Sequence, residues 1–203
     1  MRDLPRPLTG EQLSSEEYLE DFYPRFWAIG EQDFWKFERL QSFQEQGSDS
    51  WEAFKRGDWL EALHLIEERR DSLKEYYERV SSSGFTTYRV RVVEEEITPY
   101  LQWQIHSLKQ RAELGEHIRI IGQADIGAFE RDGRLPEIVT VGTNATYQVL
   151  YDHTGVLTGA VRSDRPEDLA MWRNFIEELY QKGEDVSSFF ERRVASMKPP
   201  RTT

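Results

Sequence analysis

Two strand-like segments carry basic residues of the kind that bind anions. Each segment alternates basic with apolar residues, as a strand does when one of its faces is polar. If the two strands are neighbours, their basic side chains can form one cationic face on the sheet, made of Arg89, Arg91, His117 and Arg119. Guanidinium groups match carboxylates and phosphates in a bidentate manner. The pattern therefore predicts an anion-binding face, and substitution of Arg91 by Ala should weaken the binding of whatever it holds.

The same basic residues have an alternative interpretation. Acidic residues are close in the sequence, at Glu94–Glu96 and Glu116, and others lie in the acidic N-terminal helices. Arginines on a sheet can pair with such acids inside the fold and then serve only its structure. The sequence leaves both interpretations open, because it does not show whether the basic face is open to solvent.

The remaining chemistry points to no reaction. The chain has no cysteine, its four histidines are scattered without ligand spacing, and it contains no glycine-rich phosphate loop or nucleophile elbow. Neighbouring acids such as Glu67 and Glu68 point to different sides of a helix, so they do not form a catalytic pair. We therefore predict no catalytic residue, no metal site and no cofactor.

Charge and hydropathy narrow the class of partner. The 203-residue chain has 37 acidic and 26 basic residues, a formal net charge of -11. Of these, 17 acidic and 9 basic residues lie between positions 16 and 80, so the N-terminal part carries most of the excess negative charge. Such a balance disfavours binding to duplex nucleic acid, which needs clustered Lys and Arg. No apolar run is long enough to span a membrane, and we expect a cytoplasmic protein.

The N-terminal part is predicted to be helical. Residues 1–13 are expected to form a flexible tail, and Ser14 with Glu17 has the spacing of a capping box. The segment 34–40 is too short to distinguish strand from helix. The stretch from Trp51 to Val80 has a helical apolar stripe with an interruption near Gly57, which completes an acidic helical region over 14–83.

The C-terminal part is predicted to form a sheet domain over residues 84–197, in one compact unit with the helical region. A strand over 85–93, a helix capped by Thr98 and Pro99, and a strand over 117–121 form a β-α-β unit with parallel strands. Three further strands follow, at 137–141, 147–151 and 156–162. Two closing helices come after them, at 166–183 and 186–197. The fold class is α+β (mixed α/β), with a roughly five-stranded mixed sheet and a tail at 198–203.

Several of these segments, taken in order, resemble the DUF6879 family of actinobacterial proteins. The matching landmarks are Phe34–Leu40, Phe54–Asp58, Tyr88–Val93, Thr98–Leu101 and Gly115–Arg119. The later strand at 147–151, Gly155 and Gly159 also fit, so the resemblance covers roughly residues 30–180. One departure is Glu137–Val141, which stands where the family has a W-L-F-D-like stretch. The resemblance implies an uncharacterised domain, often encoded near helix-turn-helix regulators in Streptomyces-like genomes, and supplies no catalytic residues.

Two functions follow as hypotheses. The first is a non-enzymatic regulatory or interaction protein, whose acidic helices bind a basic protein partner such as a DNA-binding regulator. The alternative is a domain that binds a small anionic ligand, or acts on one in specialised metabolism, through Arg89, Arg91 and Arg119.

Overall fold

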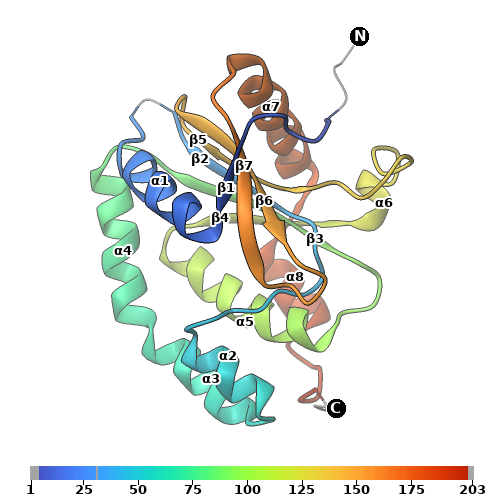
Figure 1. The fold of residues 1–203 in the computed structure, drawn as a ribbon. Coiled ribbons are helices and arrows are strands. Elements are labelled where there is room, and N and C mark those ends of the chain that lie inside the picture. Colours follow the sequence, from blue (N-terminus) through green and yellow to red (C-terminus); the bar gives the residue numbers. More distant parts are fainter. Residues whose placement is uncertain (1–4, 31, 201–203) are drawn as a thin grey trace.

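The computed structural model describes residues 5–30 and 32–200. Helices and strands alternate along these residues (Figure 1). The helices are α1 (Ser15–Trp27), α2 (Asp49–Lys55), α3 (Trp59–Glu68), α4 (Arg70–Ser82), α5 (Pro99–Leu114), α6 (Gln123–Ile126), α7 (Pro166–Lys182) and α8 (Val186–Arg193).

The strands form one mixed sheet, and the described residues contribute eight of them in the order β1-β7-β6-β5-β2-β3-β4-β8. Strands β2, β3 and β4 are parallel, β5, β6 and β7 form an antiparallel meander, and β2 joins the two halves by pairing antiparallel with β5. Their bounds are β1 (Glu11–Ser14), β2 (Phe34–Glu38), β3 (Thr87–Val93), β4 (His117–Gly122), β5 (Glu137–Val141), β6 (Ala145–Tyr151), β7 (Leu157–Ser163) and β8 (Glu184–Asp185).

Local sequence signals explain several helix boundaries. At the start of α1, the Ser14 side chain accepts a hydrogen bond from the backbone N–H of Glu17, whose carboxylate accepts one from the N–H of Ser14. Helix α5 begins with Thr98 as its cap and Pro99 in its first turn, and ends at Gly115, whose φ is 132°. These boundaries confirm the predicted capping residues.

Helices cover both faces of the sheet and divide the apolar core. Helix α7 packs on one face, where Trp172 and Ile176 are fully buried against apolar residues of β2, β3 and β5. On the other face, α5 and α8 cover β4, while α1 and α4 cover the half formed by β5 and β6. Helices α2 and α3 lie beyond α5, at the end of the molecule away from α7 (Figure 1).

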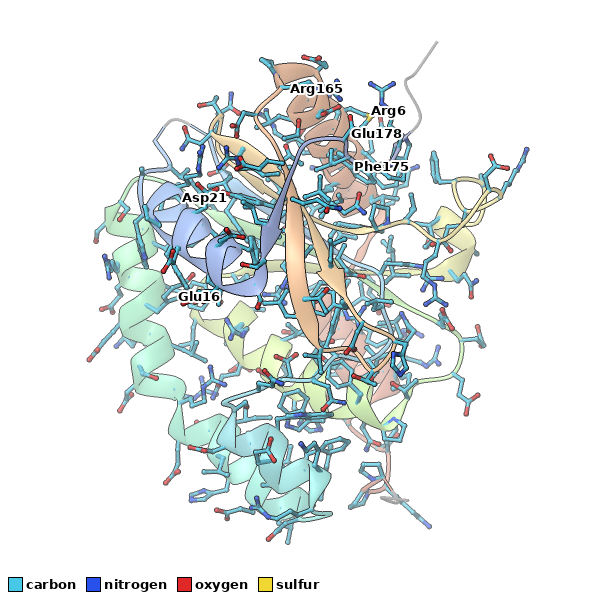
Figure 2. The ribbon with its side chains drawn as sticks, in the orientation of Figure 1. Arg6, Glu16, Asp21, Arg165, Phe175 and Glu178 are labelled. Carbon is cyan, nitrogen blue, oxygen red and sulfur yellow. The ribbon has the colours of Figure 1, made fainter. Side chains whose placement is uncertain are left out.

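Ion pairs, partly exposed to solvent, attach the N-terminal elements to this core. Asp21 of α1 accepts a hydrogen bond from the hydroxyl of Tyr147 at 2.7 Å and pairs with Arg162 of β7 at 3.0 Å. At the start of α7, the buried Asp168 pairs with Arg165, and Arg6 lies 4.0 Å from it. Figure 2 shows Asp21 on α1, and Arg6 and Arg165 close to the first turn of α7.

The structure confirms the α+β class and corrects the extent of the sheet. Five strands are predicted and eight are present among the described residues, the additional ones being β1, β2 and β8. Strand β2, from the region predicted to be helical, lies between β5 and β3. The N-terminal and C-terminal parts therefore share one sheet. The prediction of a tail over 1–13 is wrong at β1, which pairs with β7, and at Leu8, which is buried.

The predicted tails also reach residues 1–4 and 201–203, which lie outside the described residues. In the part that the structure describes, the helices are all too short or too polar to cross a membrane.

Candidate functional site

Charged side chains line the face of β2 and β3 that turns toward α5. Lys36 and Glu38 lie on β2, directly opposite Arg89 and Arg91 of β3 in the parallel register. Residues paired in this way point to the same face of a sheet. Four charged side chains thus lie together where an apolar surface is the usual arrangement.

Glu38 holds three of these cations. Its carboxylate accepts hydrogen bonds from Lys36 at 2.7 Å and Arg89 at 2.9 Å, and lies 3.7 Å from Arg91. Burial by itself would raise the pKa of this carboxyl, but the charges of Arg89, Lys36 and Arg91 outweigh it and hold the pKa far below its ordinary value. Glu38 is therefore ionised at neutral pH.

Arg91 is fully buried, and its hydrogen bonds go to groups in the interior of the protein. Its Nε donates to Oε1 of Gln104 at 2.8 Å, and its Nη1 donates to the backbone carbonyls of Glu38 and Val92. Its Nη2 is buried without a hydrogen-bond partner among the described residues. Since a buried charge is tolerated only when it is paired, these contacts make Arg91 part of the frame of the site.

A second group of charges adjoins the first one. Glu116, directly before β4, accepts hydrogen bonds from Arg89 at 2.7 Å and from the hydroxyl of Tyr77 at 2.6 Å. Arg111 of α5 donates to Tyr77 at 3.2 Å and lies 3.9 Å from Glu116. Burial would raise the pKa of Glu116, but Arg89 and Arg111 keep it below its ordinary value. The cluster thus has four cations, Lys36, Arg89, Arg91 and Arg111, against the carboxylates of Glu38 and Glu116.

A third carboxyl adds only part of a charge. Glu137 of β5 is buried and accepts hydrogen bonds from the backbone N–H groups of Arg39 and Leu40. Burial raises its pKa to about 7, against a lowering effect of Arg91. Near neutral pH this carboxyl is partly protonated, so the cluster retains a positive excess.

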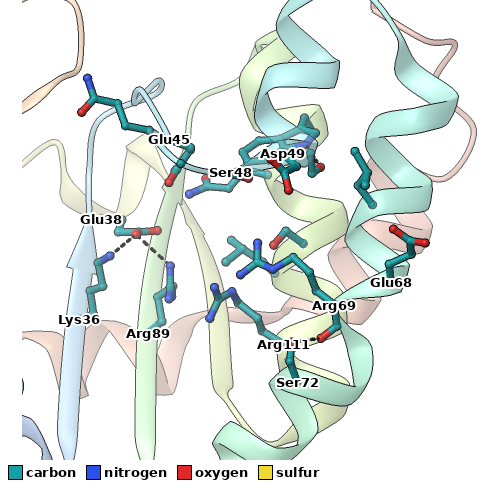
Figure 3. A pocket seen from close by; sticks show the side chains of 18 residues that line it. Lys36, Glu38, Glu45, Ser48, Asp49, Glu68, Arg69, Ser72, Arg89 and Arg111 are labelled. Atoms are coloured by element: carbon teal, nitrogen blue, oxygen red, sulfur yellow. Dashed lines mark hydrogen bonds and ion pairs between the residues drawn. The ribbon is translucent and has the colours of Figure 1, made fainter.

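A cavity of about 600 Å³ opens over this cluster. Strands β2 and β3 form one wall and α5 forms another. The loop 45–48, the start of α2 and the junction of α3 and α4 close the cavity. Figure 3 shows Arg69 and Arg111 directing their guanidinium groups into the cavity, across from Lys36 and Arg89. Acidic side chains also line it, namely Glu38, Glu45, Asp49 and Glu68.

Arg69 differs from the other cations of the cavity. It lies at the break between α3 and α4, it is exposed, and no ion pair joins its guanidinium to a carboxylate of the described residues. Partial burial lowers its pKa and the charge of Arg111 lowers it further, while the nearby carboxylates of Glu45 and Asp49 act in the opposite direction. The guanidinium groups of Arg69 and Arg111 repel each other, and Arg69 forms no ion pair with a described carboxylate. An anion that binds between the two groups is therefore stabilised.

The predicted cationic face is only half correct. Arg89 and Arg91 share a face, but the register places Arg89 opposite Ile118, and Tyr88 opposite His117. His117 and Arg119 therefore lie on the other face of the sheet, where Arg119 lies over the ring of Tyr180 in α7. The prediction that all four residues form one face is wrong, because parallel pairing offsets the two basic rows by one residue.

The alternative interpretation of the arginines is confirmed for part of the set. Arg89 pairs with Glu116, as that interpretation expects, and Glu94 pairs with Arg39 of the segment after β2. Sequence reasoning missed Lys36, Arg69 and Arg111 as parts of the site. For Lys36 a signal exists, since Lys36 and Glu38 alternate with Trp35 and Phe37 as in a strand.

The comparison with family models gives one match. The model described as a domain of unknown function (DUF6879) matches residues 20–191, which include every charged residue of the cavity. The chain belongs to the DUF6879 family. A search of curated proteins finds no match to it. This member of DUF6879 thus carries its charged cavity within the part of the chain that defines the family.

Proposed function

We propose that this protein binds a small anionic ligand in the cavity between β2, β3, α5 and the α3–α4 junction. The observation that carries the proposal is the pair of guanidinium groups of Arg69 and Arg111, which face Lys36 and Arg89 across the cavity. The cluster on the sheet has more cations than carboxylates, in a chain whose net charge is -11. Over the whole cavity wall four basic residues face four acidic ones, so the place for a ligand carboxylate or phosphate is local, beside Arg69, which forms no ion pair with a described residue.

Binding fits this cavity better than catalysis does. Its 18 described lining residues include serines but no histidine. The hydroxyl of Ser50 already donates to the carbonyl of Ala62 at 2.7 Å and accepts from the indole of Trp103 at 2.9 Å, so it is not held by a base as an activated nucleophile is. The proposal is therefore a non-enzymatic, ligand-binding protein of the cytoplasm.

The test is the binding of inorganic phosphate and acetate in a buffer of low chloride content. Calorimetry and thermal shift both report such binding, because a ligand that binds only the folded state raises the melting temperature. We expect Arg69→Gln to weaken phosphate binding roughly tenfold or more, the effect of losing a charge-assisted hydrogen bond. Arg69 forms no ion pair with any of the residues that the structure describes, so the variant should remain folded.

Arg70→Gln is the matched control. Arg70 is the next residue, but its guanidinium pairs with Glu67 and Glu113 and does not line this cavity. The control should bind phosphate like the wild type. If the two variants bind equally well, or if neither anion binds the wild type at millimolar concentration, the proposal is wrong.

A second candidate function has an observation of its own. Leu60, at the start of α3, is 78 % exposed, which is unusual for a large apolar side chain. Exposed acids follow on α3 and α4, at Glu68, Asp71, Glu75 and Glu78. This surface fits a basic protein partner, such as a DNA-binding regulator, because complementary charge accelerates association.

The partner proposal is tested with the immobilised protein at low and high salt. A partner held by charge should be retained at low salt and released at high salt, and Leu60→Ser combined with Glu75→Lys should abolish its retention. Glu20→Lys, at an exposed position of α1, makes the same change of charge as Glu75→Lys outside the α3–α4 surface and serves as the control. If no protein is retained at low salt, this second candidate is wrong.

A further inference from the structure

Two acidic side chains of the charged cavity have no cationic partner among the described residues. Glu45 lies in the loop before α2, and Asp49 is the first residue of that helix. Glu45 accepts a hydrogen bond from the hydroxyl of Tyr100 at 2.6 Å, and this neutral donor leaves the charge of the carboxylate uncompensated. The carboxylate of Asp49 is exposed and forms neither an ion pair nor a hydrogen bond with a described residue. We refer to Glu45 and Asp49 as the acidic pair of the cavity.

The other two acids of the cavity wall already contact basic side chains. Glu38 holds Lys36 and Arg89, as described above. The carboxylate of Glu68 lies 3.4 Å from Nε2 of His64, one turn earlier on α3. The acidic pair therefore supplies the carboxylates of this wall that are left for a bound cationic group.

The acidic pair lies across the cavity from Arg69. Figure 3 shows Glu45 and Asp49 above the guanidinium groups of Arg69 and Arg111. Both carboxylates raise the pKa of Arg69, so their charges reach its guanidinium, yet neither forms an ion pair with it. The cavity thus has a positive side and a negative side that are not joined by a salt bridge.

This arrangement disfavours a ligand that carries negative charge alone. An anion beside Arg69 is attracted by the guanidinium groups and repelled by the acidic pair, because charges in a partly buried space interact over several ångströms. A positively charged group at the other end of the ligand turns that repulsion into attraction. A ligand with both charges is therefore stabilised on both sides of the cavity.

The size and polarity of the cavity limit the rest of the ligand. Its volume of about 600 Å³ lies within the range of about 300–1,000 Å³ that is usual for small-molecule sites. Apart from Leu65, Trp103 and Leu108, the described residues of its wall are polar or glycine. Polar groups lose free energy when they are covered without a hydrogen-bond partner, so this wall suits a small polar molecule and disfavours an apolar one.

We infer that the ligand is a small polar zwitterion of the amino-acid type. Its carboxylate or phosphate lies beside Arg69 and Arg111, and its ammonium group lies against Glu45 and Asp49. This inference rests on the proposed anion binding, and it adds the chemical class of the ligand.

The first measurement compares acids with and without an amino group. Glycine is compared with acetate, β-alanine with propionate, 4-aminobutyrate with butyrate, and phosphoethanolamine with ethyl phosphate, by calorimetry on the full-length protein. We expect at least one aminated acid to bind tenfold or more tightly than its counterpart, and Arg69→Gln to weaken its binding roughly tenfold. The pair of acids with the largest difference gives the spacing between the two charged groups of the ligand.

The outcomes separate this inference from the proposed function. If acetate and phosphate bind with the dependence on Arg69 described above but no amino group adds affinity, the inference is wrong and the proposed function stands. An aminated acid that binds equally well to Arg69→Gln also contradicts the inference. If an aminated acid binds through Arg69 but acetate and phosphate do not bind, the zwitterion is supported and the binding of anions alone is wrong. If none of the probes binds, both are wrong.

The second measurement removes the charges of the acidic pair by combining Glu45→Gln with Asp49→Asn. Both substitutions keep an oxygen that accepts hydrogen bonds, including the one from Tyr100, and Ser48 still caps α2. The variant should therefore fold. We expect the preference for the aminated acid over its counterpart to fall at least fivefold, while the counterpart binds at least as tightly as it binds the wild type.

Glu16→Gln combined with Glu20→Gln is the matched control. It removes the same amount of charge from exposed positions of α1, a helix that does not line this cavity. The control should keep the full preference for the aminated acid. A preference that survives the removal of the acidic pair, or that is lost equally in the control, overturns the assignment of Glu45 and Asp49.

Discussion

Glu38 is the residue on which the arrangement of charges at the sheet depends. Its carboxylate is 3 % exposed and contacts Lys36 and Arg89, with Arg91 at 3.7 Å. Removal of one partner from a buried ion pair leaves an uncompensated charge, at a cost of about 3–5 kcal/mol. We expect Glu38→Gln to lower the free energy of unfolding by about 3 kcal/mol in urea denaturation. Glu20→Gln, at an exposed position of α1, should change it by less than about 0.5 kcal/mol. Equal stability of the two variants would contradict the pairing.

Glu137 should make the stability depend on pH. Burial raises its pKa from 4.5 to about 7, so between these pH values the folded protein keeps a proton that the unfolded chain has lost. Its contribution to stability is present below pH 4.5 and is lost as the pH rises to about 7, a change on the order of 3 kcal/mol. Glu137→Gln keeps an oxygen acceptor for the backbone N–H groups but does not titrate. The difference in unfolding free energy between variant and wild type should therefore change across this range, and a constant difference would refute the assignment.

At the scale of elements, the edge strand β1 depends on a glycine of its neighbour. A Cβ at Gly159, whose φ is 150°, would lie 2.1 Å from the backbone oxygen of Leu13. Since no side chain fits there, Gly159→Ala should displace β1 and lower the free energy of unfolding by about 2 kcal/mol. Hydrogen exchange should show loss of protection in Glu11–Ser14. Gly30→Ala is the control, because nothing lies within 4 Å of its Cβ position, and it should leave exchange in β1 unchanged.

The elements that the sequence predicts correctly carry strong local signals. The β-α-β unit around α5, the start of α1 after Ser14 and the break at Gly57 all follow from periodicity, caps and turn residues. The segment of β2 is too short for its sequence to distinguish strand from helix. It also places Lys36 and Glu38 on a face that is covered in the fold, where strand positions are usually apolar. Those charges are tolerated because residues far away in the sequence, Arg89 and Arg91, pair with them.

For the candidate site, too, the sequence predicts local features but not contacts between residues that are far apart in the chain. Alternation in each strand correctly separated Arg89 and Arg91 from Val90, and His117 and Arg119 from Ile118. The register between the two strands is not contained in either pattern alone, because it depends on how both strands and their connection fit together. The remaining site residues, Arg69 and Arg111, lie on helices whose approach to the sheet is a property of the tertiary structure.

At the scale of the whole molecule, the shared sheet predicts a single cooperative unit. Strand β2 comes from the N-terminal part and lies between β5 and β3 of the C-terminal part. Without it, the fragment 84–203 has two unpaired strand edges in the middle of its sheet and an uncovered apolar face. We expect tryptophan fluorescence and far-ultraviolet circular dichroism to report one coincident urea transition for the full chain. The fragment 84–203 should be unfolded, whereas 15–203, which lacks only the edge strand β1 and the segment before it, should fold. A folded 84–203 fragment, or two separate transitions, would mean that the two parts are independent domains.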